Sequence, residues 1–347
     1  MVDPQPGVLA AQTRYSVFLV LTIRTDPDAR ARVRALCGNV DKLSRAVGAR
    51  DIEGNLSYAI GFGSAAWDQL FGQPRPAALH PFVELRAGAR SAPSTPGDLW
   101  IHIRSERADL CYELAAQMMA RVSGHVTATD ETHGFRYFDD RDLTGFVDGT
   151  ENPSGEEKAT AALVGAEDPA FEGGSYVMVQ KYVHDLPAWH RLTTEAQEGI
   201  IGRTKLDDIE LEDDVKPTYA HNALTTLVEN GTEVKILRHN MPFGNVTGGE
   251  AGTYFIGYAR SLHPLEAMLE AMVIGRPPGN YDHLLDFTKP VTGTNFFVPS
   301  QTFLSALAPD AAPEVLEPAA ATAQARAQSE RPGTLRIGNL KGVSQHE

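Results

Sequence analysis

The sequence is poor in cysteine, in basic residues and in long apolar runs. Its 347 residues include two cysteines, Cys37 and Cys111, which lie far apart and form no CxxC pair. Neither a disulfide framework nor a zinc site is therefore indicated. Lys and Arg number 31 against 45 Asp and Glu, a formal net charge of -14. Because phosphate backbones and anionic lipids repel such a chain, we expect no nucleic-acid partner.

No segment has the length and apolarity of a membrane span. The apolar run at residues 15–23 is too short to cross a bilayer and is rich in β-branched and aromatic residues. The opening MVDPQPGVLAAQ lacks a basic region followed by an apolar one and a cleavage site. We therefore expect no membrane partner and a cytoplasmic location.

What the sequence does contain is a dense globular region followed by a polar stretch. Hydrophobic residues make up 42% and charged residues 22%, which is ordinary for a globular protein. The region after residue 308 is rich in Ala, Pro, Glu and Gln and predicts a flexible linker. The predicted divisions are an N-terminal tail (1–13), a first half (14–150), a second half (151–308), the linker (309–332) and a C-terminal tail (333–347).

The globular region looks internally duplicated. An apolar strand pattern opens each half, at residues 15–23 and 174–186. A strand running into a helix with apolar residues at helical spacing then follows in each, at residues 99–120 and 252–273. Strands covered by helices in two similar units indicate a duplicated α+β fold of the ferredoxin-like kind.

One loop sequence is especially distinctive: GFVDGTENP at residues 145–153. Asp-Gly favours a tight turn and Asn-Pro restricts the residue before the proline, so the local prediction is a turn. The stretch resembles the GxxDG signature of dye-decolourising (DyP-type) haem peroxidases, in the form typical of bacterial B-type members. Four further segments resemble family motifs in the same order, namely residues 201–211, 217–222, 236–244 and a closing helix and strand at 281–300.

The resemblance implies a fold, a cofactor and a reaction. The family fold is two ferredoxin-like halves of the dimeric α+β barrel type, with one haem b per subunit in the C-terminal half. The implied activity is reduction of hydrogen peroxide and oxidation of dyes, phenols or similar one-electron donors. Two alternatives stay open, a haem-handling protein such as a dechelatase and a haem-storage protein without turnover.

By this resemblance His221 is the axial ligand of the haem iron. An axial imidazole pushes electron density onto iron when its other nitrogen donates to a carboxylate. Asp282 is our first choice for that carboxylate. Asp286 lies one helical turn further on the same expected face and stays an alternative. His239 is the nearest rival ligand, but its neighbours Arg238 and Asn240 indicate a side chain that points away.

The implied distal residues are Asp148, Arg238 and Asn240. A carboxylate at hydrogen-bond range can take a proton from one peroxide oxygen and return it to the other, and Asp148 is our candidate. Arg238 is expected to lower the pKa of Asp148 and to stabilise charge on the departing oxygen. Asn240, two residues on along an extended segment, is expected on the same face, where it holds a water or the peroxide.

Four further residues are candidate cofactor contacts. Arg203 is expected to pair with a haem propionate, because guanidinium and carboxylate match as forks. Glu151 and Asn152 follow Asp148 and are expected to line the haem edge. Phe255 is expected to pack on the porphyrin face, although core packing is the commoner fate of a strand aromatic.

The C-terminal tail, GTLRIGNLKG at residues 333–342, is apolar after a polar linker. Leu335 and Ile337 share one face of an extended strand, and Leu340 follows a glycine that lets the chain bend. The peptide resembles the cargo-loading peptide that docks inside encapsulin shells. It predicts an encapsulin shell protein as partner and an encapsulin nanocompartment as location, and the family resemblance suggests a homodimer or a hexamer.

Overall fold

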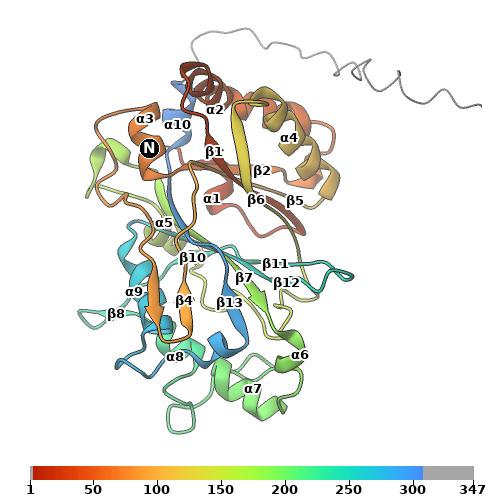
Figure 1. Cartoon of the computed structure of the whole chain (residues 1–347), viewed down its shortest axis with the longest axis vertical. Coiled ribbons are helices and arrows are strands. Elements are labelled where there is room, and N and C mark those ends of the chain that lie inside the picture. Colours follow the sequence, from red (N-terminus) through yellow and green to blue (C-terminus); the bar gives the residue numbers. More distant parts are fainter. Residues whose placement is uncertain (1–2, 308–347) are drawn as a thin grey trace, which may run out of the picture. The chain divides into compact units, whose positions relative to one another are not determined.

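The computed structural model describes residues 3–307, and one antiparallel sheet of ten strands organises them. The linker and the C-terminal tail expected from the sequence lie outside these residues. Two sets of strands make up the sheet (Figure 1). The first set is β1 (Tyr15–Ile23), β2 (Ser57–Phe62), β5 (Leu99–Ser105) and β6 (Val126–Phe135). The second is β7 (Ser175–His184), β10 (Leu237–Arg238), β11 (Met241–Gly244), β12 (Ala251–Ala259), β13 (Thr288–Pro290) and β14 (Thr294–Val298).

Both sets have the same strand order, so the expected duplication is confirmed. The first set has the order β2-β5-β1-β6 and the second the order β10-β12-β7-β14. In each set, the strand that comes first in the chain stands third in the sheet. Helices α2 (Pro27–Gly48) and α4 (Ala108–Arg121) connect strands of the first set, and α9 (His263–Val273) connects β12 to β14. This is the ferredoxin-like α+β arrangement, repeated once.

Local sequence explains where the longest helix begins and which face it buries. The Asp26 side chain accepts a hydrogen bond from the backbone N–H of Ala29 at 2.8 Å, and Pro27 occupies the first helical position. From there every third or fourth residue of α2 is buried, including Val33, Leu36 and Val40. The apolar stripe packs on the sheet, which fixes α2 over the first half.

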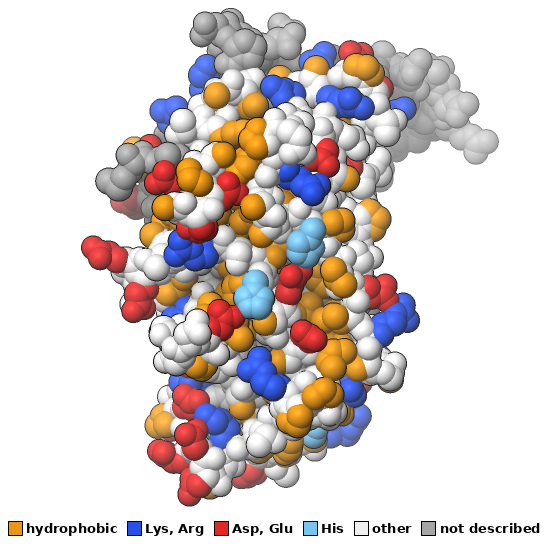
Figure 2. Space-filling model, turned by 90° about the vertical axis from the view of Figure 1, so that its left-hand side faces the viewer, with side chains coloured by type: hydrophobic (Ala, Val, Ile, Leu, Met, Phe, Trp, Pro, Cys, Tyr) orange, Lys and Arg blue, Asp and Glu red, His pale blue; other side chains and the backbone are white. Residues whose placement is uncertain are grey.

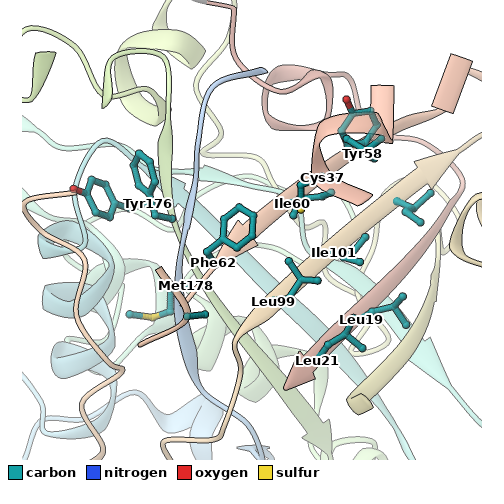
Figure 3. Packing of buried hydrophobic residues seen from close by; sticks show 14 of the residues in the cluster. Leu19, Leu21, Cys37, Tyr58, Ile60, Phe62, Leu99, Ile101, Tyr176 and Met178 are labelled. Atoms are coloured by element: carbon teal, nitrogen blue, oxygen red, sulfur yellow. The ribbon is translucent and has the colours of Figure 1, made fainter. Parts of the chain in front are cut away.

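The strands are apolar on both faces because two separate cores flank them. Alternate residues such as Leu19, Ile60 and Ile101 pack under the helices (Figure 3). The opposite residues, such as Phe18, Trp100 and Tyr254, form an inner core in which side chains of both halves meet. The sheet therefore curves into a barrel around this inner core, as the resemblance implies.

The junction between the halves within the sheet is narrow. β14 pairs with β2 through Phe297 and Phe62 alone. The buried Gln5 side chain strengthens this junction, because its amide donates to the carbonyls of both Ile60 and Pro299, each at 2.9 Å. Within residues 3–307 no helix is both long and apolar enough to cross a membrane.

The remaining elements are short. In the first half they are α1 (Pro6–Leu9), η1 (Ile52–Gly54), α3 (Ser64–Leu70), β3 (Leu85–Ala87) and β4 (Arg90–Ala92). In the second they are α5 (Glu157–Ala162), η2 (Pro169–Phe171), α6 (Leu186–Trp189), α7 (Thr194–Ile201), α8 (His221–Thr225), β8 (Val228–Glu229), β9 (Thr232–Glu233), η3 (His283–Asp286) and α10 (Gln301–Ser305). On the face shown in Figure 2, acidic, basic and apolar side chains are interspersed.

Candidate active site

A cavity of about 220 Å³ opens on the outer face of the second set of strands. Met178, Gln180 and Tyr182 of β7 and Thr253 and Phe255 of β12 line it. The residues between them face the inner core instead, because strand side chains alternate. Helices α8 and α9 lie in the same lower part of Figure 1 and contribute further lining residues, which are His221, Asn222, Thr225, Leu265, Met268, Leu269 and Met272.

His221 lines this cavity and is held by a buried carboxylate. Its Nδ1 lies 2.6 Å from Oδ2 of Asp282, a residue with 0% exposure. The other oxygen of Asp282 accepts from the backbone N–H of Leu284 at 2.9 Å, which caps η3. An ionised carboxylate only accepts, so Nδ1 of His221 donates, and in the neutral ring this leaves Nε2 as the nitrogen that can bind a metal. His221 thus has the arrangement of a metal-binding imidazole.

The other carboxylate considered for His221 lies elsewhere. Asp286 accepts a hydrogen bond from the phenol of Tyr281 at 3.1 Å. Residues 283–286 form a 3-10 turn rather than the α-helix expected at the start of the 281–300 segment. Asp282 and Asp286 would share a face in an α-helical turn, whereas the tighter 3-10 geometry separates them.

The GFVDG loop places Asp148 on the cavity wall. Gly145 and Gly149 both have φ of +93°, where a side chain would be strained, and a Cβ on Gly145 would lie 2.6 Å from Lys205 Cε. The backbone N–H of Asp148 donates to the carbonyl of Asp140 at 2.9 Å. Its Oδ1 accepts from the Asn240 amide at 3.2 Å, so the carboxylate is oriented before any ligand arrives.

Arg238 lowers the pKa of Asp148, as predicted from the sequence, but the net shift of this pKa is upward rather than downward. Removal of the carboxyl group from water raises the pKa of Asp148, and this outweighs the lowering by Arg238. The negative charge of Asp142 raises it further. No ion pair joins Arg238 to Asp148 among the described residues, which explains why the guanidinium does not dominate.

The segment from Arg238 to Asn240 alternates as the sequence predicts. Arg238 and Asn240 line the cavity, whereas His239 is 6% exposed and contacts Arg104 on the opposite face. Asn152 does not line the cavity. Its side chain instead holds the backbone of Arg238, accepting from the N–H at 2.8 Å and donating to the carbonyl at 2.9 Å.

The candidate propionate contact, Arg203, lines the cavity but already has carboxylate partners. It donates to Asp208 at 2.8 Å and to Glu151 at 2.9 Å. Glu151 and Phe255 also line the cavity. The four predicted contacts are therefore gathered around one cavity, three on its wall and Asn152 behind it.

Sequence reasoning missed a polar network at the cavity wall. The Asp142 carboxylate accepts from the backbone N–H of Thr144 at 2.7 Å and contacts the Thr253 hydroxyl and Nε2 of His184. Although burial alone raises it, these hydrogen bonds hold the pKa of Asp142 well below its usual range. Asp142 and His184 lie 42 positions apart, and no local pattern links them.

Polar atoms left without protein partners indicate what the cavity accommodates. Among the described residues, the Gln180 amide nitrogen is buried and unsatisfied, and the Arg238 guanidinium makes no hydrogen bond. No group of three or more His, Cys, Asp and Glu side chains within residues 3–307 is arranged to hold a metal ion directly. A lone imidazole in a largely apolar cavity would instead suit a metal that a cofactor carries with its own ligands, such as the iron of haem.

Comparisons with known proteins agree with this geometry. Two family models match, "Dyp-type peroxidase, N-terminal" over residues 5–136 and "Dyp-type peroxidase, C-terminal" over residues 139–303. A dye-decolorizing peroxidase of Mycolicibacterium paratuberculosis is 51% identical over 99% of this chain and 94% of its own length. The crystal structure of DyPB from Rhodococcus jostii RHA1 has a TM-score of 0.86 and 51% identity, covering 87% of this chain and 97% of that one.

A third relative is a cryo-EM structure of an encapsulated DyP-type peroxidase from Mycobacterium smegmatis. It is 52% identical, with a TM-score of 0.86, and the match covers 89% of this chain and 99% of that chain. A variant of the Rhodococcus jostii protein was solved in complex with heme, at 50% identity and 87% coverage of this chain.

Proposed function

The chain belongs to the Dyp-type peroxidase family, and we propose that it is a haem-dependent peroxidase that reduces hydrogen peroxide and oxidises dyes, phenols or similar one-electron donors. One observation carries the proposal. A carboxylate-held imidazole, His221, lines the same cavity as a carboxylate, a guanidinium and an amide, those of Asp148, Arg238 and Asn240.

The residues of the cavity fit one haem b per subunit. His221, whose Nδ1 donates to Asp282, would hold the haem iron through Nε2. Apolar side chains of α9, such as Leu265 and Met272, suit the porphyrin, and Arg203 suits a propionate. When bound, haem supplies the two-electron exchange with peroxide that protein side chains lack.

The chain's own residues handle protons and charge. Asp148 takes a proton from one peroxide oxygen and returns it to the other, with its carboxylate oriented by Asn240. Arg238 stabilises the negative charge that develops on the departing oxygen. Asp282 keeps His221 in the tautomer that binds iron and makes the imidazole a stronger donor.

The proposal is tested by removing the ligand. His221→Ala is expected to abolish the Soret band and most of the pigment, with an exposed histidine variant, His190→Ala, as control. An unchanged Soret band in His221→Ala contradicts the proposal.

Asp148→Asn is expected to retain haem and to react with peroxide about 10²–10⁴-fold more slowly, measured by stopped-flow absorption. If Asp148→Asn reacts with peroxide and oxidises dye at the wild-type rate, Asp148 is not the base. Release of fluorescent free porphyrin from haem identifies a dechelatase instead.

We further propose that the chain is cargo of an encapsulin shell. The supports are the sequence of the 333–342 tail and the encapsulated relative from Mycobacterium smegmatis. In this proposal, apolar pockets on the inner wall of the shell bind the side chains of Leu335, Ile337 and Leu340. A flexible coil as long as the predicted linker, residues 309–332, spans about 25–30 Å.

Co-expression with a shell protein tests the packaging. Wild-type chain is expected to co-elute with assembled shells, and Leu335→Asp combined with Ile337→Asp is expected to remain outside them. A control change beyond the motif, Ser344→Asp, retains loading. Equal loading of the wild type, the double variant and Ser344→Asp contradicts the role of the tail.

The proposed oligomer is a homodimer that assembles to a hexamer. Several tails on one particle bind several wall sites, which strengthens loading without any new contact. Light scattering of the purified protein distinguishes these states from a monomer.

A further inference from the structure

A buried arginine inside the barrel lacks a carboxylate partner within residues 3–307. Arg104 of β5 is 1% exposed, and no ion pair to it exists there. Its guanidinium contacts Nδ1 of His239 and donates to the carbonyl of Ala10 and, at 3.4 Å, to the hydroxyl of Ser57. Burial lowers the pKa of Arg104 to about 10, which still leaves the group charged at neutral and acidic pH. An unpaired buried charge is costly, so its retention calls for a reason beyond stability.

The Arg104 contact fixes the state of His239. Arginine only donates, so Nδ1 of His239 accepts, and the neutral ring carries its proton on Nε2. Burial, reinforced by the charge of Arg104, holds the pKa of His239 well below its usual range. The neutral His239 ring is therefore an acceptor for Arg104.

The backbone around His239 lies in a break of the sheet. β10 ends at Arg238 and β11 begins at Met241. The N–H of His239 donates to Ile256 at 3.0 Å, but the N–H of Ile256 donates to the side chain of Asn240, at 3.1 Å, rather than to a backbone carbonyl. The positions of residues 238–240 thus depend on side-chain contacts more than those of an ordinary strand do.

The side chains that hold residues 238–240 lie on both faces of the sheet and belong to both halves of the globular region. Asn152 holds the backbone of Arg238 on the cavity face. Arg104 of the first half holds His239 on the barrel face. The N-terminal segment joins them, because Ala10 accepts from Arg104 and the Gln12 amide donates to the carbonyl of Asn240 at 3.0 Å.

We propose that Arg104 and His239 form a brace inside the barrel that positions Arg238 and Asn240 in the peroxide-reacting cavity. The inference rests on the proposed function for its catalytic consequence. Arg104 and His239 are positioning residues, since neither lines the cavity.

The test compares His239→Leu with His239→Gln and with a matched control, His102→Leu. His102 is a second buried histidine of the inner core, 1% exposed, whose nearest polar contacts are Ser16 and Tyr258 at 3.4 Å. Leucine removes the acceptor at either site, whereas the oxygen of glutamine replaces it at position 239. Haem content and thermal stability are measured for all variants.

Two readouts separate positioning from general stability. The first is hydrogen–deuterium exchange of the peptide containing residues 238–241. His239→Leu is expected to raise its exchange about 10- to 100-fold, the equilibrium equivalent of one lost hydrogen bond to a charged donor. The second is kinetic: the rate constant for peroxide is expected to fall about tenfold or more, with the KM for the dye unchanged.

We expect His239→Leu to exchange faster and to react more slowly with peroxide than the wild type. His239→Gln is expected to recover both properties, and His102→Leu is expected to match the wild type. Arg104→Met is expected to match His239→Leu, and combining the two is expected to add little because they remove the same contact. Equal exchange and equal peroxide rates in His239→Leu and His102→Leu overturn the brace. If the wild-type protein binds no haem, the proposed function is refuted instead. The hydrogen–deuterium exchange of residues 238–241 then still tests the brace, because it does not depend on haem.

Discussion

At the residue scale, the protonation of Asp148 is set by its surroundings rather than by its motif. Burial raises its pKa, Arg238 and the hydrogen bond from Asn240 lower it, and the charge of Asp142 raises it again. A general base works only when deprotonated. The rate of reaction with peroxide is therefore expected to decline on the acidic side at a higher pH than an ordinary aspartate allows.

Asp142→Asn is expected to shift that acidic limb to lower pH. Because the pKa of Asp142 is held low, its charge persists to lower pH than that of an ordinary aspartate and opposes ionisation of Asp148 there. Removing the charge lowers the pKa of Asp148, and the base form then persists further into acid. Stopped-flow rates between acidic and neutral pH, with Thr253→Val as a control that disturbs the same network without a charge change, measure the shift. A limb that moves upward refutes this account.

The carboxylate behind His221 makes a second prediction at this scale. Asp282→Asn replaces the carboxylate 2.6 Å from Nδ1 by a neutral amide, which has a weaker acceptor and can also present its NH2 group to the imidazole. Changes to such partners typically cost about 10- to 100-fold in metal affinity or activity, and haem affinity is expected to fall within this range. Haem-transfer titration to an apo-globin acceptor measures it.

Asp286→Asn is the matched control, because Asp286 contacts Tyr281 instead of His221. Haem affinity in this variant is expected to equal that of the wild type. Equal losses in both variants mean that the 281–286 segment acts through its fold rather than through one carboxylate.

At the scale of elements, the loop that carries Asp148 is held by one arginine. Arg141 donates to the carbonyls of Gly145, Lys205 and Leu206 at 2.9, 2.5 and 3.1 Å. It thereby joins the GFVDG loop to the segment that follows α7. Its side chain is 17% exposed; the bonds to Gly145 and Lys205 are partly buried, whereas the bond to Leu206 is exposed.

Arg141→Ala is therefore expected to loosen the distal loop. Leaving a partly buried carbonyl unpaired costs about 1–3 kcal/mol where water does not replace the donor, so the lost bonds to Gly145 and Lys205 are expected to lower the Tm by several degrees. Arg136→Ala is the control, since its pair with Asp140 is 41% and 38% exposed and contributes little. Calorimetry of both variants decides. A larger loss in Arg136→Ala contradicts the role given to Arg141.

Sequence patterns predicted these elements unevenly, for a physical reason. The strand at residues 15–23 and the helix spacing after Leu99 follow from local periodicity, and the structure has both. The turn at residues 145–149 follows from its glycines. The contacts of Arg104 and Asp142 join segments 135 and 42 positions apart, where no local period operates, so the sequence alone did not reveal them. Burial raises the pKa of Asp148 by more than the charge of Arg238 lowers it, and this balance can be worked out only from the fold.

At the scale of the whole molecule, the two halves depend on each other. Their inner faces share one core, and the distal strand segment is braced by an arginine of the other half. The described residues accordingly form one compact unit. Because the cofactor cavity is built on the second half, loss of contact between halves is expected to disturb it.

Gln5 offers a direct test of this dependence. Its side chain is 1% exposed, donates to Ile60 and Pro299 across the junction, and accepts from the N–H of Ile60 at 2.7 Å. Gln5→Ala leaves three backbone groups without partners where the sheet has one pairing between halves, at a cost of about 1–3 kcal/mol for each group that stays dry. Because the halves share their core, the variant is expected to unfold in one transition at a lower temperature, with haem released in that same transition. Gln12→Ala, which removes an exposed bond, is the control. Two separate transitions in Gln5→Ala, followed by Soret absorption and far-UV circular dichroism together, mean instead that each half folds alone and that the inner core is a contact between independent units.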